Sequence, residues 1–381
     1  NTVLALQQDR DGNLWIGLDR GIDFVALRSP LTIFTDQTGR IGTVYTASEW
    51  NGRLYIGTNQ GVFTREICAR SAFCNASFRL VEGTQGQVWQ LQVLDNQLLC
   101  GHNGGTFRID GVAADKISDV TGGWCTVDIP GHPGVLLQST YTGLVLFQKD
   151  AAGRWQFSHR IGGFKEPLKK IVFDEQGTLW GVHPNKGLFR LRLNDKLDQV
   201  TEFKEYTRED GLPTEFRLDI AIFEHRIVVN TSPAPMRIDT GKEHPVFQAL
   251  NGDLNRRKLL PGLAPEYFAV DSSGVRMING QRSYYFPLTL VPSFENIVAL
   301  SKEKYLFCLE NGFAVLDKRL LVDSAPLVSP APVIRSVETS GGESFLANKD
   351  MSFAWKQNSL RFHFAAPFFE RPPKFSWRLE G

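Results

Sequence analysis

The chain has 381 residues, of which 42% are hydrophobic and 11% aromatic, and its formal net charge is +1. This length and apolar content suffice for a large hydrophobic core, whereas the near-zero charge excludes the basic field typical of proteins that bind nucleic acid or an anionic membrane. The 35 glycines and 19 prolines indicate a β protein rich in turns. We find no apolar run of membrane-spanning length, and we expect no cofactor and no metal.

The first predicted element is a hairpin within residues 9–22, DRDGNLWIGLDRGI. Asp9 and Gly12 bracket a tight turn, in which an aspartate accepts backbone hydrogen bonds and a glycine supplies a positive φ. An apolar strand around Trp15 follows, and Gly21 opens the next strand. The same pattern returns along most of the chain, so it predicts architecture rather than chemistry.

Copies of the second strand of this hairpin recur about every forty residues. Eight copies are found, and they end at Gly17, Gly57, Gly101, Ser139, Val182, Asn230, Ile278 and Cys308. Two short sequence motifs accompany these copies. D-x-x-G stands before the strand, and a glycine followed by an apolar residue stands after it, as at Gly312-Phe313. Four short strands in forty residues are typical of a propeller blade. We therefore predict an all-β fold with a β-propeller over residues 1–323, of eight blades or of seven with one incomplete copy.

The repeats end near Asp323, and a different pattern follows. Residues 324–333 are punctuated by proline, which indicates a linker at a domain edge. Strand-like segments follow at 334–339, 344–345 and 359–365, the last with alternating apolar residues. We expect residues 334–381 to be the first part of a β-sandwich, truncated in mid-strand, and the chain to be a piece of a longer protein.

Five cysteines are present, and none has the spacing of a zinc site or a Cys-x-x-Cys motif. Cys68 and Cys74 flank a polar segment and would form either a local disulfide or two loop thiols. Cys100, Cys125 and Cys308 lie in strand-like segments, and we predict that each is a small buried hydrophobic residue.

The repeats resemble those of a known family. DGNLWIGLDRGI, LYIGTNQGVF and GTLWGVHPNKGLFRL are similar to the two-component regulator propeller repeat. NSLRFHFAAPFF followed by FSWRLEG resembles the start of the triple-tyrosine domain, an immunoglobulin-like module, with Phe375 and Trp377 at tyrosine positions. The resemblance favours seven blades. It implies the periplasmic sensor region of a membrane-anchored regulator, either a hybrid two-component sensor kinase or a one-component DNA-binding protein.

A ligand of such a propeller would bind where the loops entering the innermost strands meet the loops after the second strands. A polar ring with aromatic residues suits a sugar, because sugar rings stack on aromatic faces. The candidate ligand-binding residues are the aromatic platforms Trp124, Tyr141 and Trp89 and the donors Arg217, His102, His183 and Arg20.

Each of these candidates also has a structural interpretation. Trp89 would pack between blades, the two histidines would satisfy loop backbone groups, and Arg217 would pair with a carboxylate. No catalytic constellation is found: the seven histidines include no His-x-x-x-His pair, and Glu209-Asp210 lies in a solvated turn.

The sequence thus predicts an extracytoplasmic domain that senses a ligand and does no chemistry. By analogy with the family the ligand is an oligosaccharide derived from a glycan, the signal passes most simply across a homodimer, and this fragment contacts no nucleic acid. Two alternatives stay open: a propeller enzyme acting on glycans as a lyase or hydrolase, and a scaffold for protein interactions.

Overall fold

The computed structural model describes residues 2–10, 12–27, 29–67, 77–240, 245–250, 252–321, 333–346, 351–356 and 359–365. The chain divides into two compact units: Leu31–Lys318, and Asn1–Pro30 together with Arg319–Gly381. Within the described residues the fold is all-β apart from three short 3-10 helices, η1 (Arg208–Asp210), η2 (Gly252–Leu254) and η3 (Lys318–Leu320). None of the helices described is long and apolar enough to cross a membrane.

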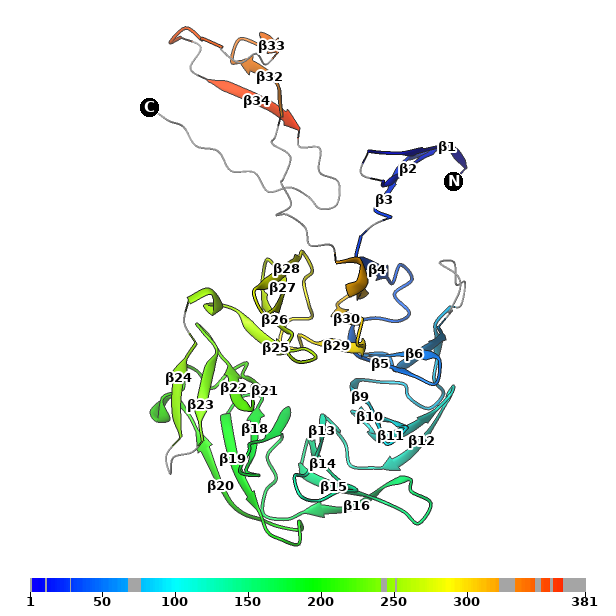
Figure 1. The fold of residues 1–381 in the computed structure, drawn as a ribbon, viewed down its shortest axis with the longest axis vertical. Helices are drawn as coiled ribbons and strands as arrows, with labels where there is room; N and C mark the ends of the chain where they lie inside the picture. Colours follow the sequence, from blue (N-terminus) through cyan, green and yellow to red (C-terminus); the bar gives the residue numbers. More distant parts are fainter. Residues whose placement is uncertain are drawn as a thin grey trace. The chain divides into compact units, whose positions relative to one another are not determined.

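The larger unit holds seven four-stranded antiparallel sheets, numbered here from 1 to 7 in ring order (Figure 1). Sheet 1 consists of β5 (Val44–Trp50), β6 (Arg53–Thr58), β7 (Val62–Glu66) and β8 (Arg79–Leu80), and sheet 2 of β9 (Val88–Leu94), β10 (Gln97–His102), β11 (Gly105–Asp110) and β12 (Ala113–Ser118). Sheet 3 consists of β13 (Cys125–Asp128), β14 (Val135–Thr140), β15 (Gly143–Lys149) and β16 (Trp155–Ile161), and sheet 4 of β17 (Lys170–Phe173), β18 (Leu179–His183), β19 (Gly187–Leu193) and β20 (Val200–Tyr206).

Sheets 5 to 7 complete the ring. Sheet 5 consists of β21 (Asp219–Phe223), β22 (Arg226–Asn230), β23 (Met236–Asp239) and β24 (Val246–Ala249), and sheet 6 of β25 (Lys258–Pro261), β26 (Tyr267–Asp271), β27 (Gly274–Asn279) and β28 (Arg282–Phe286). Sheet 7 consists of β29 (Ile297–Ser301), β30 (Lys304–Leu309), β31 (Gly312–Asp317) and β4 (Leu31–Thr35). Neighbouring sheets contact each other largely through the first strand of each sheet, which is the innermost one (Figure 1). This radial arrangement is a β-propeller.

The ring is closed by a strand from far away in the sequence. β4 pairs antiparallel with β31, so that Leu31 lies opposite Leu316 and Thr35 opposite Gly312. The ring of Phe34 stacks on that of Phe313, with centroids 5.0 Å apart. The last sheet therefore joins the beginning of the unit to its end, and this pairing closes the ring of sheets.

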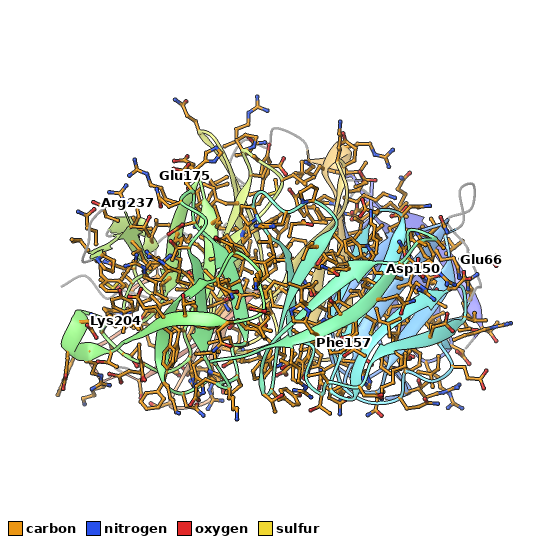
Figure 2. All side chains as sticks on the ribbon, turned by 90° about the horizontal axis from the view of Figure 1, so that it is seen from below. Glu66, Asp150, Phe157, Glu175, Lys204 and Arg237 are labelled. Carbon is orange, nitrogen blue, oxygen red and sulfur yellow. The ribbon has the colours of Figure 1, made fainter. Side chains whose placement is uncertain are left out.

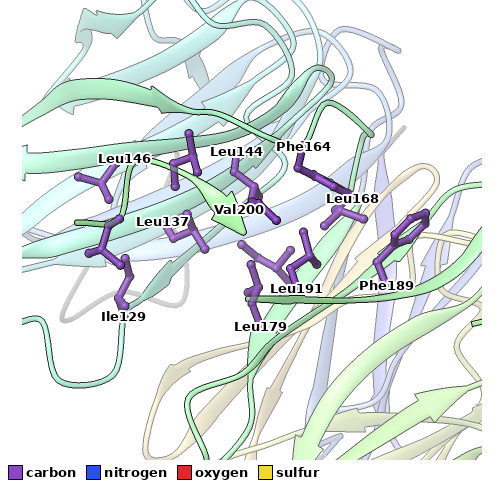
Figure 3. Packing of buried hydrophobic residues seen from close by; sticks show 13 residues of the cluster. Ile129, Leu137, Leu144, Leu146, Phe164, Leu168, Leu179, Phe189, Leu191 and Val200 are labelled. Carbon is purple, nitrogen blue, oxygen red and sulfur yellow. The ribbon is translucent and has the colours of Figure 1, made fainter. Parts of the chain in front are cut away.

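Hydrophobic clusters fill the spaces between neighbouring sheets. Between sheets 3 and 4, leucines of β14 and β15 pack against Leu179 of β18 and against Phe189 and Leu191 of β19 (Figure 3). Between sheets 4 and 5, Trp180 packs with Ile220. Charged side chains such as Glu66, Lys204 and Arg237 extend instead at the outer rim (Figure 2). Each sheet thus buries both faces against its neighbours, which an isolated sheet could not do.

The predicted D-x-x-G turn is a hydrogen-bonded unit. In the turn between β17 and β18, the buried Asp174 carboxylate accepts the backbone N–H groups of Gln176 and Thr178 at 3.0 and 2.8 Å. Its other oxygen accepts the indole N–H of Trp180 at 2.8 Å. Asp9 makes the matching bond to Trp15 at 3.1 Å. The motif therefore fixes the turn and the tryptophan together.

Replacing Asp174 by alanine is expected to lower the free energy of unfolding by about 2 kcal/mol, because it leaves the buried indole N–H of Trp180 without an acceptor. Asp150→Ala is the matched control, since Asp150 also accepts three N–H groups of its own turn but none from a buried side chain. Chemical denaturation of both variants measures the difference. An equal loss in both would show that the turn matters and the tryptophan does not.

The second recurring motif, a glycine followed by an apolar residue, has a steric cause. Gly312 opens β31 with φ 115°, and a Cβ at this position would overlap the backbone carbonyl oxygen of Phe34 on the outermost strand. The same conflict is met at Gly105, Gly187 and Gly274, and at Gly143 the carbonyl is that of Phe164, which follows the outermost strand of its sheet. Gly21 opens β3 with φ 150° but meets no atom within 4 Å, and among the described residues β3 has no fourth strand beside it.

The smaller unit contains two three-stranded sheets in its described part. One is β1 (Val3–Gln8), β2 (Leu14–Leu18) and β3 (Gly21–Val25); the other is β32 (Val333–Thr339), β33 (Ser344–Leu346) and β34 (Leu360–Ala365) in the order β33-β32-β34. The three strands expected after the linker are thus present. Residues 324–332 of the predicted linker, the possible disulfide of Cys68 and Cys74 and the last expected strand, with Phe375 and Trp377, lie outside the described residues.

Two details of the predicted repeat need correction. Residues 1–30, which carry the first copy, group with Arg319–Gly381 and not with the propeller unit. The copy ending at Ile278 was aligned one strand too late, because that segment is β27, the third strand of its sheet; the second strand is β26. The error arose because the Asp271-to-Gly274 segment looks like a first turn, whereas Gly274 is the glycine that opens a third strand.

Candidate functional site

Side chains from all seven sheets of the propeller meet around the start of the innermost strands. Each lies within three residues of the beginning of such a strand, except for one tyrosine in the turn after β14. We call this set the entry ring, and it consists of Tyr45, Trp89, Trp124, Tyr141, Lys169, Lys170, Asp219, Lys258, Phe294 and Glu295. Its aromatic and its charged members form two separate groups.

The aromatic group joins sheets 1, 2, 3 and 7. Trp89 lies at its centre, stacked on Phe294 with centroids 5.4 Å apart and in edge contact with Tyr45 at 6.0 Å and Trp124 at 5.9 Å. Trp124 contacts Tyr141 at 5.0 Å. The indole N–H of Trp89 donates to the Tyr141 hydroxyl at 3.0 Å. All five rings are partly exposed.

The aromatic geometry is held by hydrogen bonding and by close packing of the backbone. A Cβ at Gly122, which has φ 81°, would overlap the ring of Tyr141. The backbone N–H of Trp124 donates to the Ser139 carbonyl at 2.9 Å. The buried indole N–H of Trp124 has no partner among the described residues, which is uncommon for a buried donor.

The charged group joins sheets 4, 5, 6 and 7. Asp219 is buried and bridges two ammonium groups, that of Lys170 at 3.2 Å and that of Lys258 at 2.6 Å. Lys258 also contacts Glu295 at 2.7 Å. The carboxylate of Glu295 in turn accepts the backbone N–H of Ser293 at 3.0 Å. These contacts link the innermost strands of four sheets.

The electrostatics of this group follow from the ion pairs. Burial on its own raises the pKa of Asp219, but the ammonium groups of Lys170 and Lys258 outweigh burial and hold that pKa well below its usual range. Burial lowers the pKa of Lys258, but Asp219 and Glu295 outweigh it and raise that pKa above its usual value. Both groups are therefore charged at neutral pH.

The structure places the seven predicted site residues differently. It brings Trp89, Trp124 and Tyr141 together in one aromatic group. Arg217 lies two residues before β21, is exposed, and makes no hydrogen bond or ion pair with another described residue. Arg20 lies in the turn between β2 and β3, in the smaller unit and outside the seven sheets.

The two predicted histidines serve their own loops. The Nδ1 atoms of His102 and His183 accept the backbone N–H groups of Gly104 and Asn185, both at 2.9 Å. Both rings are buried, and burial lowers the pKa of each imidazole. The geometry fits the structural interpretation, in which these histidines satisfy the backbone of the turn after the second strand.

Sequence reasoning missed the charged half of the ring. The copy ending at Ile278 is one strand late and therefore does not point to Lys258. Glu266, which precedes β26, lies elsewhere: it is buried and accepts hydrogen bonds from Tyr305 at 2.5 Å and Lys318 at 2.8 Å. Phe294 lies in a ten-residue loop with no repeat signal. With the repeat aligned on β26, the innermost strand of that sheet would have been β25, which begins at Lys258.

Other chemically relevant groups lie away from the entry ring. A cavity of about 420 Å³ lies at the opposite end of the innermost strands, between the β13–β14 loop and the β17–β18 and β19–β20 turns, where Arg190 and Arg192 line it. Cys100 and Cys308 are fully buried, as predicted, and burial raises the pKa of both thiols well above its usual range, whereas Cys125 is partly exposed. Among the described residues no three His, Cys, Asp or Glu side chains are grouped to hold a metal.

Three comparisons place this geometry among known proteins. Residues 1–20 match the family model of the two component regulator propeller. No curated protein matches the chain in sequence. The extracellular domain of BT3049 from B. thetaiotaomicron, a proposed hybrid two component system, is 14% identical with a TM-score of 0.66 over 95% of this chain and 52% of that chain.

Two further solved structures share the fold. The extracellular domain of BT4673 from B. thetaiotaomicron, a proposed one component system, is 14% identical with a TM-score of 0.57 over 91% of this chain and 50% of that chain. Virginiamycin B lyase from Staphylococcus aureus is 11% identical with a TM-score of 0.52 over 75% of this chain and 98% of that chain. The chain thus spans about half the length of the two B. thetaiotaomicron structures. The chain is all-β, contains a propeller over Leu31–Lys318, and matches the two component regulator propeller repeat at residues 1–20, in its smaller unit.

Proposed function

We propose that this propeller is the ligand-binding part of a sensor, in the extracytoplasmic region of a membrane-anchored regulator of transcription. The propeller repeat at residues 1–20 and the likeness to extracellular domains of proposed one- and two-component systems support this role. The location would be periplasmic. Ligand binding would bias a two-state arrangement of the propeller and the segment after it, most simply within a homodimer.

The observation that carries the proposal is the convergence of Trp89, Trp124, Tyr141 and Phe294 at one end of the innermost strands. Partly exposed aromatic faces beside fixed polar groups are typical of sites for small ligands. Sugars combine apolar ring faces with hydroxyl groups, so an oligosaccharide fits both halves of the ring. The charged half supplies donors and acceptors from Lys170, Lys258 and Glu295.

Trp124→Ala is expected to weaken oligosaccharide binding about tenfold or more, because it removes a central aromatic face. The measurement is a thermal-shift screen of the chain against a panel of oligosaccharides, followed by titration of each hit. Trp355→Ala is the matched control, since Trp355 is 82% exposed and belongs to the smaller unit. An unchanged affinity in the Trp124 variant would place the ligand elsewhere.

A propeller enzyme is the second candidate, because virginiamycin B lyase shares the fold. The charged half of the ring offers two carboxylates, Asp219 and Glu295, but Lys258 pairs with both of them. An ionised, paired Asp219 is a poor proton donor. Chromatography of the same oligosaccharides after incubation decides between the candidates: shortened products favour the enzyme, and a melting-temperature rise without products favours the sensor.

A further inference from the structure

Lys169 lies between the aromatic and the charged half of the entry ring. Its ammonium group is 4.0 Å from the centroid of the Phe294 ring and donates a hydrogen bond to the backbone carbonyl of Ser293. It makes no ion pair with a carboxylate of any described residue. The amine is thus held by a π face and a neutral carbonyl, neither of which carries a full negative charge.

The charges around Lys169 do not balance. Three ammonium groups, those of Lys169, Lys170 and Lys258, face two carboxylates, Asp219 and Glu295. Both carboxylates are already engaged, Asp219 by two lysines and Glu295 by Lys258. One positive charge is therefore left over in a partly buried position. An unpaired buried charge is costly, and a group that pairs with it recovers part of that cost.

We infer that Lys169 binds an anionic group of the ligand, a carboxylate or sulfate carried by a sugar that stacks on the aromatic half of the ring. This inference rests on the function proposed above and narrows its ligand to acidic oligosaccharides. The amine lies against Phe294, which itself stacks on Trp89, so one ligand can meet the aromatic faces and the amine together. Charge-assisted hydrogen bonds of this kind are among the strong ones.

The protonation of Lys169 gives a second readout. Burial lowers its pKa to about 8, with Lys258 and Lys170 acting in the same direction and Asp219 and Glu295 against it. A bound anion favours the ammonium form and raises this pKa again. Binding at pH 8 should therefore take up about half a proton per ligand, and affinity for the anion should fall as the pH rises from 7 to 9.

The test is isothermal titration of the chain with two matched pairs of sugars. Trigalacturonate is compared with its fully methyl-esterified form, and neocarrabiose 4-sulfate with neocarrabiose, so the two pairs separate carboxylate from sulfate. We expect at least one acidic member to bind ten times more tightly than its uncharged partner, with proton uptake at pH 8. Lys169→Gln should abolish that preference and the uptake, so that the two members of the pair bind with similar affinity.

Lys149→Gln is the matched control, because the Lys149 amine also lies over an aromatic ring, that of Trp155 at 5.0 Å, but is paired with Asp95 at 2.7 Å and lies outside the entry ring, and it should keep the preference. A melting curve shows whether each variant is folded; Lys169→Gln should melt no lower than the parent, since it removes an uncompensated charge. Equal affinity for charged and uncharged members, or a preference that survives Lys169→Gln, overturns the inference and leaves the sensor function standing. If no sugar of either pair or of the wider panel binds, the proposed function fails, and the inference fails with it.

Discussion

Asp219→Ala is expected to lower the free energy of unfolding by about 3–5 kcal/mol. Asp219 is 7% exposed and bridges Lys170 and Lys258, which come from different sheets. Removing the carboxylate leaves three ammonium groups facing Glu295 alone. Breaking one partner of a buried ion pair costs far more than the pair contributes, because the remaining charge stays buried.

Asp115→Ala is the matched control for this prediction. Asp115 also pairs with a cation, Arg108 at 2.9 Å, but its side chain is 71% exposed, and exposed ion pairs contribute about 0–1 kcal/mol. Urea denaturation at pH 7 measures both variants. A loss below about 1 kcal/mol for Asp219→Ala would mean that water or rearranged lysines compensate the site.

The pH dependence of stability checks the same carboxylate. Its folded pKa lies well below the usual range, so its stabilising contribution is present above the ordinary aspartate pKa of about 3.9 and is lost as the pH falls toward the folded value. The parent chain should therefore lose stability more steeply than Asp219→Ala below about pH 4. If the free energy of unfolding fell in parallel for the parent and the variant, Asp219 would not be the ionised carboxylate described above.

Gly312→Ala is the second change with a large expected effect, about 3 kcal/mol of destabilisation. Gly312 has φ 115°, and a methyl group there would overlap the Phe34 carbonyl oxygen of β4. The overlap would push β4 away from β31 at the point where the ring closes. The variant would therefore lose hydrogen bonds between these two strands in addition to carrying backbone strain. Thermal and urea unfolding measure the loss.

Gly52→Ala separates the two causes. Gly52 has φ 70° but meets no atom within 4 Å, so its variant carries only the left-handed backbone cost of about 1 kcal/mol. A Gly312 variant as stable as the Gly52 variant would show that β4 moves outward without penalty. A much larger loss together with a broadened transition would indicate that the ring opens at sheet 7.

Local residue chemistry was enough to predict the repeat. Asp174 is required by a contact within its own sheet, and so is Gly312. The same residue types therefore recur in the sequence wherever another sheet makes the same contact. The closure by β4 could not be read from the pattern, because its partner β31 lies more than 270 residues away and pairing of that kind depends on the whole ring.

The candidate site was predicted in its aromatic half alone. Trp124 was identified because a tryptophan after two glycines stands at a loop–strand junction, and the repeat then placed it at a strand entry. The contact of Lys169 with Phe294 joins two loops 125 residues apart, and no local pattern predicts such a meeting. Arg20 was misplaced with the propeller because its hairpin has the repeat sequence without belonging to the ring.

The closure of the ring determines where the chain enters and leaves the propeller unit. Since β4 pairs with β31, the points at which the chain enters and leaves the propeller unit, Leu31 and Lys318, lie at the same end of one sheet. The first strand of that sheet, β29, also begins at Ile297, two residues after Glu295 of the entry ring. Sheet 7 thus holds both covalent connections of the propeller unit to the rest of the chain, at the start of β4 and just after the end of β31, while the chain reaches its innermost strand from the entry ring.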